Sequence, residues 1–190
     1  MGGGADTTES GTAKTGESPS VRTLFDQARI AVRVDELAAA VAEAIPDEFI
    51  IIGVLKGSFV FVADLVRALH GAGRRPRVDF IRLSSYGAEK TSSGEVRLAG
   101  AAPAGIAGRR VLLIDDIVDT GRTLVYAREL LQAQGAADVW TCALVDKPSR
   151  REVAFTADFV GFEVPDVFIV GYGIDFAEDY RHLPYIGTVD

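Results

Sequence analysis

The sequence predicts an α/β domain with a parallel core sheet flanked by helices. From residue 26 onwards, apolar runs of strand length alternate with segments of helical periodicity, a pattern typical of parallel strands joined by helical crossovers. The clearest run is Val111-Leu112-Leu113-Ile114, four consecutive β-formers of the kind found in a sheet covered on both faces. No internal repeat is found at any period.

Hydrophobic periodicity predicts the elements in order. Apolar side chains at three- and four-residue steps indicate a helix over residues 26–45, which Pro46 ends. A buried strand at 49–54 and a tight loop at 55–58 lead to a helix around Phe61, Leu65 and Leu69. The later elements are a strand at 78–83, a polar loop at 84–94, a short strand at 95–98, the strand at 111–114, a helix from Leu124 to Gly135, and strands at 139–145 and 168–170.

The first 20 residues are expected to form a disordered tail. Twelve of them are Gly, Ser or Thr, and such a segment buries too little apolar surface to offset the entropy of ordering it. Residues 21–190 are expected to form one domain, since about 170 residues suit a single hydrophobic core.

Composition and charge exclude several classes of protein. Of 190 residues, 48% are hydrophobic, and 20 Lys and Arg against 27 Asp and Glu give a net charge of -7, so we expect no nucleic-acid partner. Apolar runs are shorter than the roughly 20 residues of a membrane helix, and no secretion signal is seen. One cysteine, Cys142, and two histidines exclude a disulfide framework, a multi-cysteine zinc site and a His-rich metal site. We expect a cytoplasmic protein.

A cluster of acidic residues follows the central apolar run. Asp115, Asp116 and Asp119 precede Thr120-Gly121-Arg122-Thr123, which opens a helix. Backbone N–H groups at a helix start, with a glycine and hydroxyls nearby, form a cradle suited to a phosphate. The carboxylates would repel a bare anion, so the ligand must also present hydroxyls, a cation or a removable proton. A sugar phosphate that chelates magnesium meets these conditions.

Simpler interpretations of this cluster are less satisfactory. A solvated loop with a helix cap would explain one aspartate, but not the whole string after four β-formers. A P-loop is excluded because no G-x-x-x-x-G-K-[ST] occurs. A phosphoacceptor receiver domain carries its acid pair near the first strand, whereas this pair lies in mid-chain.

Residues 115–123, DDIVDTGRT, closely resemble the phosphoribosyl pyrophosphate motif of type I phosphoribosyltransferases. Further blocks occur in the order found in the hypoxanthine(-guanine) phosphoribosyltransferases. They are LKGS at 55–58, SSYG at 84–87, VDKPSR at 145–150, FIVGYGID at 168–175 and RHLPYIG at 181–187. The resemblance spans about residues 24–189 and implies the fold of that family, with a small hood built from the C-terminal segment and a flexible flap loop.

The resemblance implies roles for the residues of the acidic cluster. Asp115 and Asp116 would bind the ribose hydroxyls, directly or through magnesium, although the family usually has Glu where Asp115 stands. Asp119 would be the general base that takes the proton from purine N7; the alternative is an acid favoured by the helix dipole. The 5′-phosphate would be held by Thr120, Gly121, Arg122 and Thr123, with Arg122 acting through its backbone N–H more than its side chain.

The resemblance also implies a purine site. Lys147 would donate a hydrogen bond to the 6-oxygen, which agrees with its chemistry because lysine has three donors and no acceptor. Phe168 would stack on the base, although an isolated Phe in an apolar strand is otherwise a core residue. Ile169 would offer backbone groups to the position-2 edge of the purine.

The remaining implied roles concern pyrophosphate, metal and closure. Lys56 and Gly57 belong to the family's pyrophosphate loop, where the resemblance implies a cis peptide bond between Leu55 and Lys56. Arg181 would contact pyrophosphate. Asp175 would join Asp115 and Asp116 as a magnesium ligand. Ser85 and Tyr86 match a loop that closes over the reacting centre.

These observations predict an enzyme of purine salvage. It would transfer the 5-phosphoribosyl group from phosphoribosyl pyrophosphate to hypoxanthine, and to guanine, with Mg²⁺ as cofactor, and would form IMP or GMP and pyrophosphate. One alternative is a non-catalytic regulator that binds phosphoribosyl pyrophosphate on the same fold; the acidic chain, Asp119 and Lys147 favour the enzyme. The other is a xanthine-guanine or pyrimidine-directed transferase. The family forms dimers and tetramers, so a homodimer or homotetramer is expected.

Overall fold

The computed structural model describes residues 20–46, 48–86 and 95–189. The side chains of Ser85, Tyr86 and Glu95 also lie outside the description. In chain order the elements of the described residues are β1 (Val21–Phe25), α1 (Gln27–Ala44), β2 (Phe49–Leu55), α2 (Phe59–Gly71), β3 (Arg77–Tyr86), β4 (Glu95–Leu98), β5 (Arg110–Val118), α3 (Arg122–Ala133), β6 (Asp138–Asp146), a 3-10 turn (Pro148–Arg150), β7 (Phe159–Glu163), β8 (Ile169–Val170) and β9 (Ile186–Val189).

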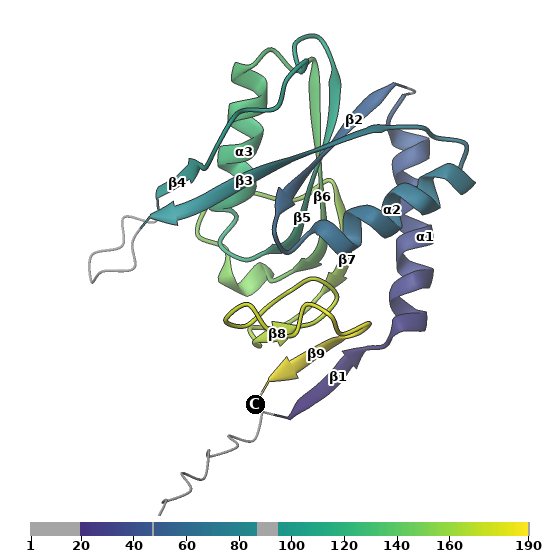
Figure 1. Ribbon diagram of the computed structural model, residues 1–190, viewed down its shortest axis with the longest axis vertical. Coiled ribbons are helices and arrows are strands. Elements are labelled where there is room, and N and C mark those ends of the chain that lie inside the picture. Colours follow the sequence, from purple (N-terminus) through teal and green to yellow (C-terminus); the bar gives the residue numbers. More distant parts are fainter. Residues whose placement is uncertain (1–19, 47, 87–94, 190) are drawn as a thin grey trace, which may run out of the picture.

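The main sheet confirms the predicted α/β class. Its strand order is β4-β3-β2-β5-β6-β7 (Figure 1). Strands β3, β2, β5, β6 and β7 are parallel, and β4 pairs antiparallel with β3 at one edge. The central positions of β2, β5 and β6 bring the carboxyl ends of three parallel strands together, which is where open α/β sheets bind their ligands.

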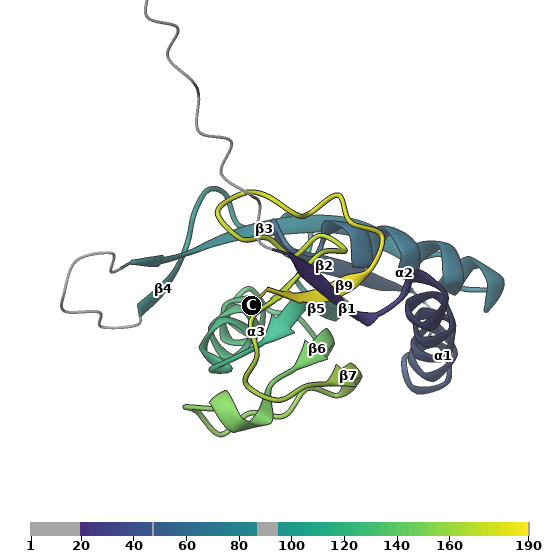
Figure 2. The same cartoon turned by 90° about the horizontal axis from the view of Figure 1, so that it is seen from below.

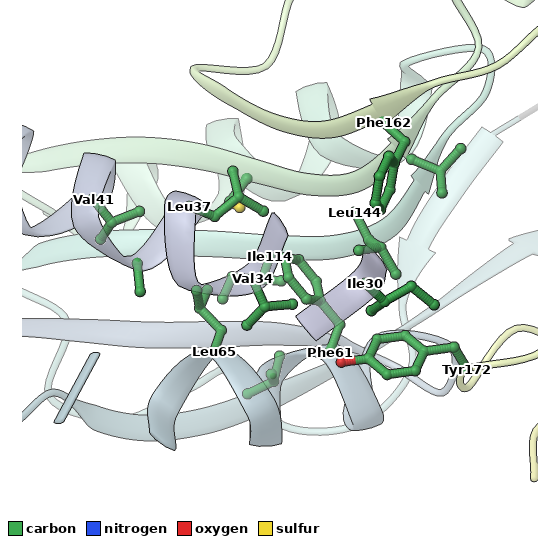
Figure 3. Packing of buried hydrophobic residues seen from close by; sticks show 14 of the residues in the cluster. Ile30, Val34, Leu37, Val41, Phe61, Leu65, Ile114, Leu144, Phe162 and Tyr172 are labelled. Carbon is green, nitrogen blue, oxygen red and sulfur yellow. The ribbon is translucent and has the colours of Figure 1, made fainter. Parts of the chain in front are cut away.

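Helices cover both faces of this sheet, and alternate residues of each central strand enter different cores. Ile51 of β2 packs with α1 and α2, whereas Ile50 and Ile52 pack with α3. Figure 3 shows the first of these cores, where Val34 and Leu37 of α1 lie near Leu65 of α2. Burial on both faces explains why β2 and β5 appear in the sequence as continuous apolar runs.

The first helix forms where its periodicity predicts. The Asp26 side chain caps it by accepting a hydrogen bond from the Arg29 N–H at 2.8 Å, which satisfies one of the free donors of the first turn. Ile45 takes an extended conformation before Pro46 and ends the helix. In its middle, the Arg33 guanidinium donates to the carbonyl oxygens of Val160 and Gly161 and fixes α1 against β7.

A second, small antiparallel sheet, β1-β9-β8, lies beside the carboxyl ends of the main sheet (Figures 1 and 2). The expected hood therefore uses residues 21–25 as well as the C-terminal segment. Strands β1, β7 and β9 were not predicted, because they have four or five residues each and give too little periodicity to detect. The sequence pattern was misleading at one further place. It also assigned residues 84–86 to a loop, whereas they extend β3 and pair with β4.

Two expectations from the sequence fall on parts of the chain beyond this description. Apart from Ser20, the expected tail of residues 1–20 lies outside the described residues, and so do residues 87–94 of the expected loop. Within the described ranges, no helix has the length and apolar character needed to cross a membrane.

Candidate active site

A cavity of about 600 Å³ lies at the carboxyl ends of the central strands. The topology explains why distant parts of the sequence meet there: β5 lies between β2 and β6, so the residues that follow these strands are neighbours. Of the residues predicted for the site, the cavity is lined by Asp115, Asp116, Asp119, Thr123, Lys147, Phe168, Ile169 and Asp175.

Two adjacent carboxyl groups form the floor of this cavity. Asp115 is buried in the second half of β5, with 5% of its surface exposed, and accepts a hydrogen bond from the Asp116 N–H at 3.0 Å. Burial raises the pKa of Asp115 well above its ordinary value, and the Asp116 charge raises it further. Burial also raises the pKa of Asp116, while its hydrogen bonds and the Arg181 charge oppose that shift. Ionisation of the buried pair is therefore unfavourable, and a bound cation would stabilise the charged form.

A small hollow beside the cavity opens at the start of α3. It is lined by backbone and side chains of Asp119, Thr120, Gly121 and Thr123, among others. Gly121 takes a φ of +87° immediately before the helix, a conformation that residues with a Cβ rarely adopt. The N–H groups and the partial positive charge of a helix start favour an anion here, and the Arg122 N–H at this start donates to Thr120 Oγ1 at 3.3 Å. The Arg122 side chain does not enter the hollow; its Nε donates to Glu152 Oε2 at 2.8 Å.

Asp119 lines both the cavity and the hollow. Arg150 Nε donates to Asp119 Oδ1 at 3.0 Å, and the same guanidinium lies 3.6 Å from Asp166 Oδ2. Arg151 donates to the Asp119 carbonyl oxygen at 2.6 Å. These contacts hold the residue from both its backbone and its side chain.

Lys147 follows β6 and is 8% exposed. Its N–H donates to the carbonyl oxygen of Val118 at 2.9 Å, and its Nζ donates to the carbonyl oxygen of Val167 at 2.7 Å. One of the three Nζ hydrogens is used in this way, so donors remain for a ligand in the cavity. The buried carboxylate of Asp146, the residue before Lys147, is paired with Arg151.

The cavity lining that includes Lys147 also carries an exposed aromatic ring. Phe168 is 51% exposed, and its edge contact with Phe176 has ring centroids 5.3 Å apart at 79°. An exposed ring at a cavity mouth offers a flat surface to a planar ligand. Ile169, in β8, lines the same cavity and is buried.

Residues predicted to contact pyrophosphate lie at the border of the cavity. The peptide bond between Leu55 and Lys56 is cis, as the resemblance implied. Gly57 lies so close to Asp116 that a Cβ there would come within 1.8 Å of Asp116 Oδ2. Arg181 reaches Asp175 Oδ1 at 2.9 Å, and Lys56 Nζ lies 2.6 Å from Glu178 Oε2. Neither Lys56 nor Arg181 lines the main cavity itself.

The carboxylates of the cavity could supply oxygen ligands to a magnesium ion. No group of three His, Cys, Asp or Glu side chains that could hold a metal occurs within the described ranges. Asp115, Asp116 and Asp175 nevertheless line one cavity. Mg²⁺ is usually bound by one or two carboxylates together with substrate oxygens and water rather than by a complete protein cage. The residues therefore fit a magnesium ion that a substrate helps to bind.

Other residues of the site had no predicted role. Asp166 and Val167 line the cavity, Arg150 pairs with Asp119, and Glu178 contacts Lys56. Arg150 belongs to the VDKPSR block. The feature that could have identified it is a cationic side chain shortly after the carboxyl end of a predicted strand. Ser85 and Tyr86 end β3 opposite Val96 and Glu95, and their side chains lie outside the description.

The fold and the cavity define a class of α/β enzymes that bind a phosphorylated sugar at the carboxyl edge of a parallel sheet. The profile of the phosphoribosyl transferase domain matches residues 20–177. The chain belongs to this phosphoribosyltransferase family.

Similar proteins are named for one reaction. The hypoxanthine phosphoribosyltransferase of Escherichia coli (strain K12) is 41% identical over 173 residues, which cover 90% of this chain and 96% of the relative. The hypoxanthine-guanine phosphoribosyltransferase of Bacillus subtilis (strain 168) is 44% identical over 169 residues, which cover 88% of this chain and 92% of the relative. A crystal structure of a hypoxanthine-guanine phosphoribosyltransferase from Bacillus anthracis is 40% identical, covers 91% of this chain and 100% of that one, and has a TM-score of 0.84.

Proposed function

We propose that residues 21–190 form a transferase domain of purine salvage. It moves the 5-phosphoribosyl group from phosphoribosyl pyrophosphate to hypoxanthine or guanine and forms IMP or GMP and pyrophosphate. The observation that carries the proposal is that one cavity brings together the Asp115–Asp116 pair, Lys147 and Phe168, and that the hollow of α3 lies directly beside it and shares Asp119 and Thr123 with it. The similarity to transferases of these bases supports it.

The ribose and its phosphate would occupy the end of β5. The N–H groups of the loop before α3 and the hydroxyls of Thr120 and Thr123 would hold the 5′-phosphate. Asp115 and Asp116 would then face the ribose hydroxyls. Asp175 would join them as a ligand of Mg²⁺. When bound, this ion would neutralise charge on the departing pyrophosphate.

The base would lie between Phe168 and the loop after β5. A free Nζ hydrogen of Lys147 would donate to the 6-oxygen, whereas the 6-amino group of adenine offers another donor and is disfavoured. Stacking on Phe168 would contribute about 1–3 kcal/mol. Asp119 would accept the N7 proton as N7 bonds to ribose C1′, a step worth about 10²–10⁴-fold in rate. Arg150 would hold the Asp119 carboxylate at the cavity wall while it acts.

Pyrophosphate would leave toward Lys56 and Arg181. Backbone groups of the Lys56–Gly57 loop and the Arg181 guanidinium would face the departing pyrophosphate. The negative charge that develops on this group must be stabilised in an oxocarbenium-like transition state. The closeness of Gly57 to Asp116 and of Arg181 to Asp175 supports this placement.

A steady-state comparison of bases tests the proposed function. Purified chain is supplied with phosphoribosyl pyrophosphate and Mg²⁺, and nucleotide formation is followed with hypoxanthine, guanine, xanthine and adenine. We expect kcat/KM for hypoxanthine or guanine to exceed that for adenine by at least ~100-fold. A clear preference for xanthine would select the xanthine-guanine transferase instead, and no product from any base would contradict the transferase.

We also propose that the chain forms a homodimer or homotetramer. Three large apolar side chains on α2 and β3 support this, because Phe59, Val78 and Phe80 are 43%, 41% and 37% exposed, and exposed apolar surface favours association. Light scattering after size-exclusion chromatography measures the mass directly. A monomer at micromolar concentration would contradict the proposal.

A further inference from the structure

We propose that Tyr172 is a positioning residue, which fixes the C-terminal segment against the loop that follows β2 and so sets the geometry of the pyrophosphate half of the site. This inference rests on the proposed function. Tyr172 contacts none of the groups assigned above to base, ribose or phosphate, and it does not line the main cavity.

The backbone around Tyr172 packs directly on the loop of residues 55–58. Gly173 takes a φ of +97°, and a Cβ on it would lie 2.4 Å from the carbonyl oxygen of Gly57. Tyr172 itself has a φ of +52°, which is rare for a residue with a large side chain and is kept only where surrounding contacts enforce it. The two segments therefore meet backbone to backbone, at a separation that a side chain would not permit.

The side chain of Tyr172 supplies the enforcing contact. The ring is 6% exposed, and its hydroxyl donates to Asp64 Oδ2 at 2.6 Å. Asp64 lies in α2, the helix that begins at Phe59 directly after the loop. Burial, reinforced by the hydrogen bond to Asp64, raises the pKa of the Tyr172 phenol, so the hydroxyl remains a donor at physiological pH. One hydrogen bond thus links the C-terminal segment to the helix that carries the loop.

Short contacts connect this anchor to the residues proposed to face pyrophosphate. The N–H of Tyr172 donates to the Leu183 carbonyl oxygen at 2.9 Å, and the N–H of Gly173 donates to that of Arg181 at 3.1 Å. In return, the Arg181 guanidinium donates to the Gly173 carbonyl oxygen at 2.8 Å and pairs with Asp175. A shift of Tyr172 would therefore move Arg181 and Asp175 relative to Lys56 and Gly57, while the β5 end of the site would stay in place.

Tyr172→Phe tests this inference, because phenylalanine fills the same space and removes only the hydroxyl. We expect the KM for phosphoribosyl pyrophosphate and the dissociation constant of inorganic pyrophosphate with Mg²⁺, measured by calorimetry, to rise about 5- to 30-fold. The kcat should fall by a similar factor, because Arg181 faces the charge that develops on pyrophosphate, whereas the KM for hypoxanthine should stay within about twofold. Asp64→Asn keeps an acceptor for the hydroxyl and should stay near wild type, whereas Asp64→Leu should behave like Tyr172→Phe.

Tyr185→Phe is the matched control, since it removes a hydroxyl from the same C-terminal segment and leaves the Asp64 contact intact. If Tyr172→Phe binds pyrophosphate like wild type, or if kcat, every KM and thermal stability decline together, Tyr172 is only a core residue and the inference is wrong. A wild-type chain that neither transfers phosphoribosyl groups nor binds pyrophosphate would overturn the proposed function, and this inference with it.

Discussion

The two halves of the site are built in different ways. The half proposed for ribose and phosphate is a continuous stretch of chain, residues 115–123, fixed by the central strand β5 and the start of α3. The half proposed for purine and pyrophosphate gathers Lys147, Phe168, Asp175 and Arg181 from separate segments that lie outside the strands of both sheets. In the first half, the regular backbone of β5 and α3 positions the residues that would contact the ligand. In the second half, hydrogen bonds from side chains to carbonyl oxygens position them, as from Lys147 to Val167 and from Arg181 to Gly173.

This difference predicts where substitutions act. In the first half, Asp119 is the side chain proposed to perform chemistry, and its loss should affect kcat, because the backbone N–H groups proposed to hold the phosphate remain when this side chain changes. Side chains of the second half should affect KM and selectivity, because they are themselves the binding groups.

The largest effect is expected at Asp119. Asp119→Asn keeps the shape of the side chain and removes the base, so kcat should fall about 10- to 10³-fold while the KM for phosphoribosyl pyrophosphate changes little. Steady-state kinetics with hypoxanthine measures both. Turnover at the wild-type rate would show that Asp119 is not the base and only stabilises α3 as an acidic residue near the positive end of the helix dipole.

Lys147 should give the next largest effect, and on selectivity. Lys147→Gln replaces donors by an amide that both donates and accepts, so kcat/KM for hypoxanthine should fall about 10- to 100-fold and the preference over adenine should narrow. Competition between the two bases measures the ratio. If the ratio of kcat/KM for hypoxanthine to that for adenine is unchanged, Lys147 has no role in purine recognition.

Asp115 should show a pH-dependent effect on stability. Burial raises its folded-state pKa above the unfolded value, so its contribution to stability is present at low pH and is lost as pH rises through the folded-state pKa. Asp115→Asn removes this loss. We expect a Tm higher than wild type by roughly 2–8 °C at pH 8 without Mg²⁺, and by less at pH 5. Scanning calorimetry at the two pH values measures the difference; a constant difference would contradict the assigned cause.

The smallest effect is expected at Arg122, although it stands inside the phosphate motif. Its side chain pairs with Glu152, both about half exposed, and such surface pairs contribute about 0–1 kcal/mol. If the backbone N–H alone acts, Arg122→Gln should change the KM for phosphoribosyl pyrophosphate by less than about twofold. A rise of tenfold or more would assign the side chain to the phosphate.

The sequence predicts the two halves unequally well, for physical reasons. The strand at 111–114 and the carboxylates after it are neighbours in the chain, so their proximity follows from local structure alone. The contact of Arg150 with Asp119 joins residues 31 positions apart, and only the pairing of β5 with β6 brings them together. Strand β1 was missed because Phe25 alone among its five residues is buried, which leaves no alternation for a periodicity argument to detect.

The pairing of β1 with β9 has a consequence for synthesis of the protein. Val21 pairs with Val189, so a strand made early on the ribosome waits for one made near the end of the described chain. The parallel core and the loop before α3 require only earlier residues, and domains generally fold as their residues emerge. A nascent chain that ends before residue 186 would thus hold an assembled hollow at the start of α3, while β8, which carries Ile169 of the proposed purine site, would still lack its partner strand β9.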